Sequence, residues 1–98
     1  MRINFHPDAE REIQEQTDWY AEKSVKAALG FMRAPDLAIA KIEADPGRFP
    51  SVRTGLFACS LVRYPFQVIF RNYGQGIQII AVAHAKRQAG FWNDRLSE

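Results

Sequence analysis

The spacing of apolar positions changes once along this chain of 98 residues, from a helical period in the first half to a strand period in the second. Residues 56–62, 66–71 and 77–83 are short apolar runs rich in β-branched and aromatic side chains, as is typical of strands buried in a sheet. Pro65 separates the first two runs, and Gly74 and Gly76 separate the last two. Since proline and glycine favour corners and turns, the pattern predicts three consecutive antiparallel strands.

The first half of the chain predicts two helices. Pro7 suits the first turn of a helix, and acidic residues follow it, as the positive end of a helix dipole favours. The polar residues 22–24 predict a turn, and Ser24 is a candidate N-cap for a second helix that ends at residues 45–47. The core-facing residues of this second helix are expected at spacings of three and four, namely Ala28, Met32, Pro35, Ile39 and Ile42.

Pro35 conflicts with an uninterrupted second helix. Proline removes a backbone donor, and its ring clashes with the preceding turn. We therefore expect Pro35 either to kink the helix near residues 31–32 or to split it, with Asp36 opening the continuation.

The order of predicted elements defines a fold class. Ile3 and Phe5 alternate with polar neighbours and predict a short opening strand. The expected order is β-α-α-β-β-β in one α+β domain, residues 1–98. We expect a helical hairpin packed on one face of a mainly antiparallel four-stranded sheet, followed by a short C-terminal helix.

The composition is that of an ordinary globular protein, with 47% apolar and 24% charged residues. No apolar run approaches the roughly 20 residues that span a bilayer, and the first residues are too polar for a signal peptide. Cys59 is the single cysteine and cannot form an internal disulfide, and its apolar neighbours predict that it is buried. We therefore expect a cytoplasmic protein without membrane contact.

Charge is distributed unevenly along the chain. Residues 1–47 carry six basic and nine acidic side chains, whereas residues 48–98 carry seven and two. One interpretation is that a basic face of the second half meets an anionic partner such as nucleic acid. The alternative, with equal weight, is a normally solvated surface.

The candidate chemistry is concentrated where the last predicted strand ends. His84, Lys86 and Arg87 follow a rigid apolar run, so that a titratable imidazole and two cations share one end of the sheet. His84 could act as a general base or acid, and Lys86 and Arg87 could stabilise the anionic transition state of RNA cleavage. The candidate nucleic-acid contacts are Phe91, Trp92, Arg71 and Arg95, the two rings being suited to stacking on unpaired bases.

Each of these residues also has a purely structural interpretation. His84 could hydrogen-bond the backbone at the strand end, and one of the two rings, Phe91 or Trp92, is expected to pack the C-terminal segment onto the sheet. Arg95 could simply complement a helix dipole. His6 and His84 are too isolated to form a metal site, and we find no motif for any cofactor.

Taken together, several short motifs resemble the RelE/ParE superfamily, the small toxins of bacterial type II toxin–antitoxin modules, which include plasmid stabilisation proteins. The motifs are FHPDAE at residues 5–10, WY at 19–20, DPGRFP at 45–50, YPF at 64–66, VIFR at 68–71, AVAHAKR at 81–87 and FW at 91–92. This resemblance implies a cytoplasmic toxin that is held inactive by an antitoxin wrapped around its helices and sheet.

The resemblance leaves the target of the toxin open. One branch of the superfamily cleaves messenger RNA on the ribosome, using an arginine and an aromatic after the last strand, which match Arg87 and either Phe91 or Trp92. Another branch poisons DNA gyrase. RNA-cleaving members often carry an arginine near the position of Gln67, and this departure argues against ribonuclease activity.

Three hypotheses follow. The first, which the C-terminal cluster favours, is a metal-independent endoribonuclease that acts on ribosome-bound mRNA. The second is an inhibitor of DNA gyrase without nuclease chemistry, and the third is a non-toxic relative that still binds an antitoxin. In each case we expect a cognate antitoxin as partner, with an amphipathic helix that packs against the region 28–42.

Overall fold

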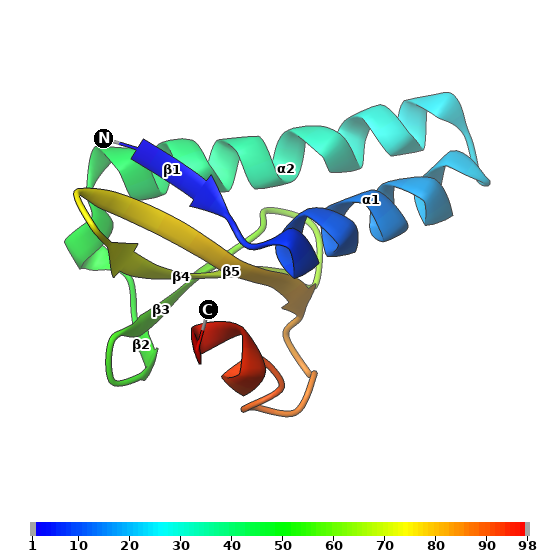
Figure 1. Ribbon diagram of the computed structural model, residues 1–98. Helices are drawn as coiled ribbons and strands as arrows, with labels where there is room; N and C mark the ends of the chain where they lie inside the picture. Colours follow the sequence, from blue (N-terminus) through cyan, green and yellow to red (C-terminus); the bar gives the residue numbers. More distant parts are fainter. Residues whose placement is uncertain (1, 98) are drawn as a thin grey trace.

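The computed structural model describes residues 2–97 and contains two helices and five strands (Figure 1). Their bounds are β1 Arg2–Phe5, α1 Pro7–Ala21, α2 Val25–Ala44, β2 Ser51–Arg53, β3 Leu56–Ser60, β4 Phe66–Tyr73 and β5 Gly76–His84. Two short 3₁₀ helices, η1 (Pro46–Arg48) and η2 (Asn93–Ser97), follow α2 and end the described chain. None of the helices in residues 2–97 is both long and apolar enough to cross a lipid bilayer.

The strands form one sheet in the order β1-β5-β4-β3-β2, which is antiparallel except for the parallel pair β1 and β5. The predicted α+β class and the mainly antiparallel pairing are confirmed. The sheet has five strands rather than four, because Ser51–Arg53 pairs with the start of β3. All three residues of β2 are exposed, so no apolar alternation revealed this strand in the sequence.

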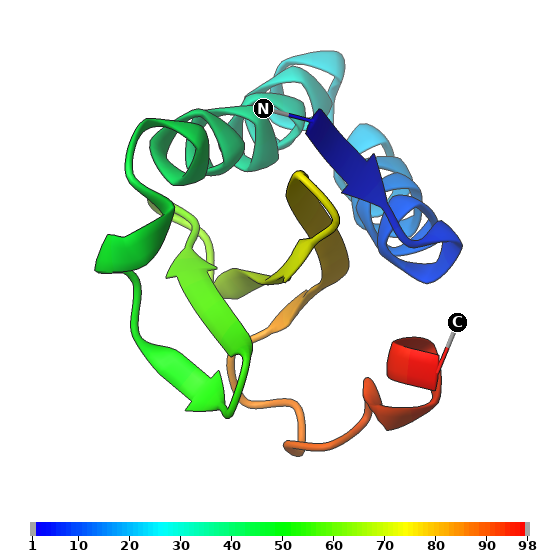
Figure 2. The same cartoon turned by 60° about the vertical axis from the view of Figure 1, so that its left-hand side comes forward.

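The sheet is covered differently on its two faces. The α1–α2 hairpin lies against one face, and the segment after β5 curls back under the other (Figures 1 and 2). On the helix side the core contains the fully buried side chains Phe31, Ile42, Val68, Phe70, Ile77 and Ile79. On the opposite side a smaller cluster contains Leu56, Ala58, Ile69, Ile80, Ala81 and Trp92. The protein is therefore a sheet between two unequal hydrophobic layers.

Helix α2 runs without a break through Pro35 (Figure 1), so of the two outcomes expected for this residue, a kink or a split, the split at Asp36 is wrong. Pro35 cannot donate a backbone hydrogen bond, but it is buried against the core, and this burial offsets part of the cost. Ser24 caps the helix as predicted, since its Oγ accepts a hydrogen bond of 2.9 Å from the backbone N–H of Ala27.

The predicted seam of α2 is wrong at one position. Met32 is 49% exposed, whereas its neighbour Phe31 is fully buried. The Phe31 ring stacks on Tyr20 of α1 and meets the edge of Tyr64, with a centroid distance of 5.2 Å in both cases. Burial, followed by the nearby Tyr64, raises the pKa of Tyr20. This aromatic cluster joins the helical hairpin to the corner between β3 and β4.

We predict that Phe31→Ala lowers the free energy of unfolding by about 3–5 kcal/mol, because it removes a fully buried ring and leaves a cavity. Met32→Ala is the matched control on the next residue and should change the stability by less than about 1 kcal/mol. Urea unfolding followed by circular dichroism measures both values. Equal losses in the two variants would contradict the packing of α2 described above.

Candidate functional site at the end of strand β5

His84 is the last residue of β5, and its side chain is exposed to solvent. It pairs with Phe66 of β4, and the two ring centroids are 5.5 Å apart. The His84 Nδ1 accepts a hydrogen bond of 3.0 Å from the backbone N–H of Lys86. Because an acceptor nitrogen carries no proton, the neutral ring bears its proton on Nε2. The lone pair of Nδ1 thus accepts a backbone hydrogen bond in the turn after β5, as expected if His84 has a structural role.

Glu12 of α1 is the centre of the ionic contacts at this end of the sheet. Its Oε1 accepts hydrogen bonds from the backbone N–H of Val82, at 3.0 Å, and from Arg95 Nη1, at 2.9 Å. Its Oε2 accepts from Arg95 Nη2, at 2.8 Å, and from Arg87 Nη1, at 3.0 Å. The Glu12 side chain is only 10% exposed. One buried carboxylate therefore joins a helix, a strand and the C-terminal segment.

The end of β1 explains why Glu12 and Arg95 meet at β5. Strand β1 pairs with β5 only as far as Phe5 opposite Ile79, and α1 begins two residues later. The pairing of β5 with β4 also shifts by one residue at this point, which leaves Ile80 as the extra residue of a bulge. The Ile80 carbonyl accepts a hydrogen bond of 3.0 Å from Arg95 Nη1, and Glu12 accepts from Val82. The ion pair thus satisfies backbone groups that β1 is too short to reach.

Arg95, predicted as a nucleic-acid contact, is buried in this structure. It is 5% exposed, and its Nε also lies 3.3 Å from a carboxylate oxygen of Asp8. The alternative that Arg95 only complements a helix dipole does not describe this contact either, because the guanidinium is paired with two carboxylates of α1. Its position fits a structural anchor for the C-terminal segment.

Arg87 and Phe91 lie together at the surface. The Arg87 guanidinium carbon is 3.8 Å from the centroid of the Phe91 ring, and Arg95 approaches the same ring at 5.1 Å. The Arg87 side chain is 46% exposed. A base could stack on the face covered by Arg87 only if this guanidinium moved away.

Trp92 is 5% exposed and packs in the cluster beneath the sheet, as we expected for one of the two rings. A buried indole offers no free face for stacking on a base, so this placement does not fit the predicted role of Trp92 in binding nucleic acid.

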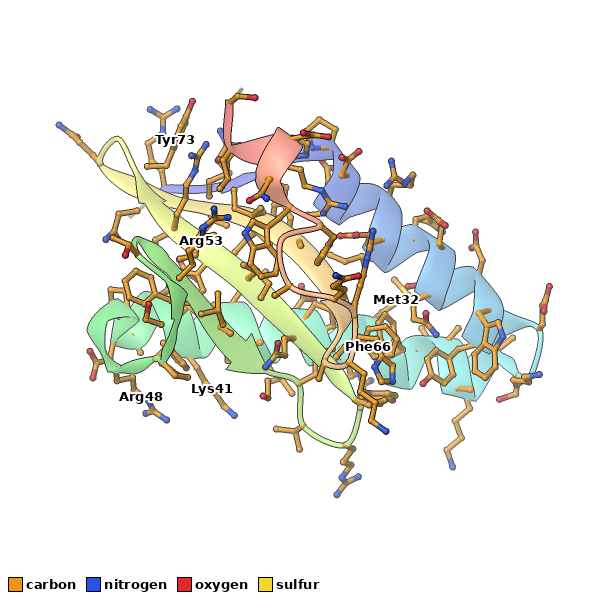
Figure 3. All side chains as sticks on the ribbon, turned by 90° about the horizontal axis from the view of Figure 1, so that it is seen from below. Met32, Lys41, Arg48, Arg53, Phe66 and Tyr73 are labelled. Atoms are coloured by element: carbon orange, nitrogen blue, oxygen red, sulfur yellow. The ribbon has the colours of Figure 1, made fainter. Side chains whose placement is uncertain are left out.

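Arg71 lies at the other end of the sheet from His84. Its Nε donates to Gln78 Oε1 at 2.9 Å and its Nη1 donates to the carbonyl of Leu96 at 3.2 Å. Arg71 lies five positions along β4 from Phe66, or roughly 17 Å of extended strand. Figure 3 shows Phe66 near one end of the sheet and Tyr73, the neighbour of Arg71, near the other. Arg71 therefore holds the C-terminal segment rather than joining the His84 cluster.

Four of the seven predicted site residues, His84, Lys86, Arg87 and Phe91, lie together near the surface at the end of β5, with Arg95 buried beside them. Trp92 packs beneath the sheet, and Arg71 lies at the other end of β4. Sequence reasoning missed Glu12, because 75 and 83 residues separate it from its two arginine partners and no local pattern joins them. In residues 2–97 there is no group of three His, Cys, Asp or Glu side chains that could hold a metal ion.

No protein-family model and no curated protein sequence matches the chain. A chain of the solved structure described as "Chromosomal ParDE TA system from P. aeruginosa" has a similar fold, with a TM-score of 0.64. The two chains are 22% identical, and the alignment covers 86% of this chain and 95% of the other. At this identity the similarity shows a shared fold.

We predict that Glu12→Gln lowers the free energy of unfolding by about 3–5 kcal/mol, because it removes the carboxylate that holds both Nη atoms of the buried Arg95 and leaves only the contact of its Nε with Asp8. Glu15→Gln is the control on the same helix. It removes an exposed pair with Arg11 and should cost less than about 1 kcal/mol. Thermal and urea unfolding of both variants test the difference, and a small loss in Glu12→Gln would show that the network is dispensable.

Proposed function

We propose that the protein is the cytoplasmic toxin of a type II toxin–antitoxin module and that it inhibits growth by binding a protein target, with DNA gyrase as the first candidate. Two findings support the assignment to a toxin: the sequence motifs that resemble the RelE/ParE superfamily, and the fold shared with a chain of a ParDE toxin–antitoxin system. The toxin is held inactive by a cognate antitoxin, which is its first partner.

The observation that favours a binding mechanism is the pairing of both arginines with the Glu12 carboxylate. Cleavage of RNA without a metal needs cations around the charged transition state. Arg87 and Arg95 both donate to the Glu12 carboxylate, so that only Lys86 of the predicted cations in this cluster lacks such a partner within residues 2–97. A phosphate would have to compete with a preformed carboxylate pair for Arg87.

The contacts of His84 argue in the same direction. A general base needs a free lone pair within reach of the hydroxyl that it deprotonates. The Nδ1 lone pair of His84 already accepts from the backbone of Lys86, and Nε2 carries the proton of the neutral ring. The ring would have to leave its turn, or change tautomer, before it could accept a proton from RNA.

Cleavage of ribosome-bound mRNA is the second candidate. It is favoured by the exposure of His84, Lys86 and Arg87 at one end of β5, with the Phe91 ring beside Arg87. In this mechanism the ribosome or the message would draw Arg87 away from Glu12.

Induced expression in a bacterial host separates these mechanisms. We expect growth to stop, the DNA-damage response to rise and messages to remain intact. His84→Ala and Lys86→Ala should keep at least about half of the growth inhibition at equal protein level, since neither residue serves chemistry in a binding mechanism.

Purified protein added to DNA gyrase should also inhibit supercoiling in vitro. Messages cut at defined sites in the parent, with loss of cutting in His84→Ala, would overturn the binding mechanism in favour of RNA cleavage. Normal growth at a verified protein level would overturn the assignment to a toxin and leave a non-toxic relative that binds an antitoxin.

A further inference from the structure

The outward face of α2 is uncovered in the fold. Helix α2 runs along the outside of the molecule, and no other element of residues 2–97 lies beyond it in Figures 1 and 2. This face carries four large apolar side chains that are well exposed, namely Val25 (75%), Leu29 (51%), Met32 (49%) and Leu37 (60%). A row of exposed apolar side chains along a helix is typical of a surface that meets another protein.

The charged side chains of this face have opposite signs at equal distances from the middle of α2. The helix is 20 residues long, so its midpoint follows the tenth residue. Arg33 and Asp36 are equally far from this midpoint, and Lys26 and Glu43 are equally far from it near the two ends. All four side chains are exposed, and none of them forms an ion pair within residues 2–97.

This arrangement makes the face complementary to itself. When two copies of α2 lie antiparallel with their midpoints aligned, Arg33 of each copy is level with Asp36 of the other. Lys26 and Glu43 are level with each other in the same way. A parallel pair of helices would instead set each charge beside its own copy, and like charges in contact cost several kcal/mol.

The apolar positions match in the same antiparallel register. The pairs that come level are Leu29 with Ala40, Val25 with Ala44, and Met32 with Leu37. In two of these pairs a large side chain meets a small one, which lets the two helix surfaces interdigitate. Lys41, the remaining charged residue of α2, lies at the margin of the face, because its counterpart Ala28 is buried.

We propose that two copies of this protein associate through α2, as an antiparallel helix pair with two-fold symmetry. The ion pairs join Arg33 to Asp36 and Lys26 to Glu43 in both directions, and the exposed apolar side chains between them leave the solvent. Two such helices are about 30 Å long and 10–12 Å across. Their contact is smaller than the roughly 800 Å² per partner of a standard interface, so we expect a reversible dimer.

A second copy fits this face better than other partners do. A nucleic acid is uniformly negative and would meet Asp36 and Glu43 as well as the two cations. The antitoxin helix that we expect against the region 28–42 would compete for the same face. The second copy is favoured because it matches all four charges in a single register. The dimer does not depend on whether the protein is a toxin.

Sedimentation of the purified full-length protein over a range of concentrations tests for the dimer. We expect the dimer fraction to rise with protein concentration and to fall with added salt, which screens exposed ion pairs. Arg33→Glu and Asp36→Arg should each weaken association at least about tenfold, because each sets like charges level with one another. Lys41→Glu is the control at the margin of the face and should change association less than about twofold.

A mixture of the two variants tests the register. In a pair of one Arg33→Glu chain and one Asp36→Arg chain, every charge again faces one of opposite sign. The mixture should therefore form a heterodimer, seen by native mass spectrometry, although neither variant associates alone. Lys26→Glu and Glu43→Lys repeat the test at the outer pair.

Three results would overturn the inference. The first is a protein that stays monomeric at every concentration, which would leave the antitoxin helix as the occupant of the face. The second is a dimer that Arg33→Glu does not weaken. The third is a mixture that fails to associate while both variants keep the circular dichroism of the parent. None of these results bears on growth inhibition, so each leaves the proposed function standing.

Discussion

The buried pair between Glu12 and Arg95 is the interaction on which the rest of the structure depends. It is a two-pronged contact, with distances of 2.9 and 2.8 Å, between side chains that are 10% and 6% exposed. The same side chains satisfy the backbone of β5 at Ile80 and Val82, beyond the last residue paired with β1. A carboxylate and a guanidinium thus take the place of a longer first strand. Loss of either partner is strongly destabilising, because the charge of the other partner remains buried.

The contacts of Arg95 also account for part of the positive charge in the second half of the chain. The residues after β5 are held beneath the sheet by Arg95 and Arg71, so that part of the positive charge of the second half serves internal anchoring. Other cations form no ion pair within residues 2–97, among them Lys86 beside His84 and Arg63 at the corner between β3 and β4. Part of the uneven charge of the sequence therefore has a structural cause.

Much of the fold could be predicted from the sequence because its signals are local. The apolar runs of β4 and β5, the proline that starts α1 and the cap at Ser24 each act within a few residues. The site was less predictable, because the burial of Arg95 depends on a carboxylate 83 residues away. Strand β2 was not predicted because all its residues are exposed and it has no apolar face. The spacing of apolar residues in α2 placed Met32 in the core, but the helix turns Phe31 inward instead, and spacing alone does not distinguish two adjacent apolar residues. Contacts between segments far apart in the sequence bury Arg95 and pair Arg71 with the C-terminal segment, and no local pattern predicts such contacts.

The most direct measurement is a double-mutant cycle on the free energy of unfolding, with Glu12→Gln, Arg95→Gln and the combined variant. If the pair is the joint between α1, β5 and the C-terminal segment, the two losses should overlap and the coupling should be about 2 kcal/mol or more. Additive losses, with a coupling below about 0.5 kcal/mol, would contradict this role and imply that packing of Trp92 alone holds the segment in place.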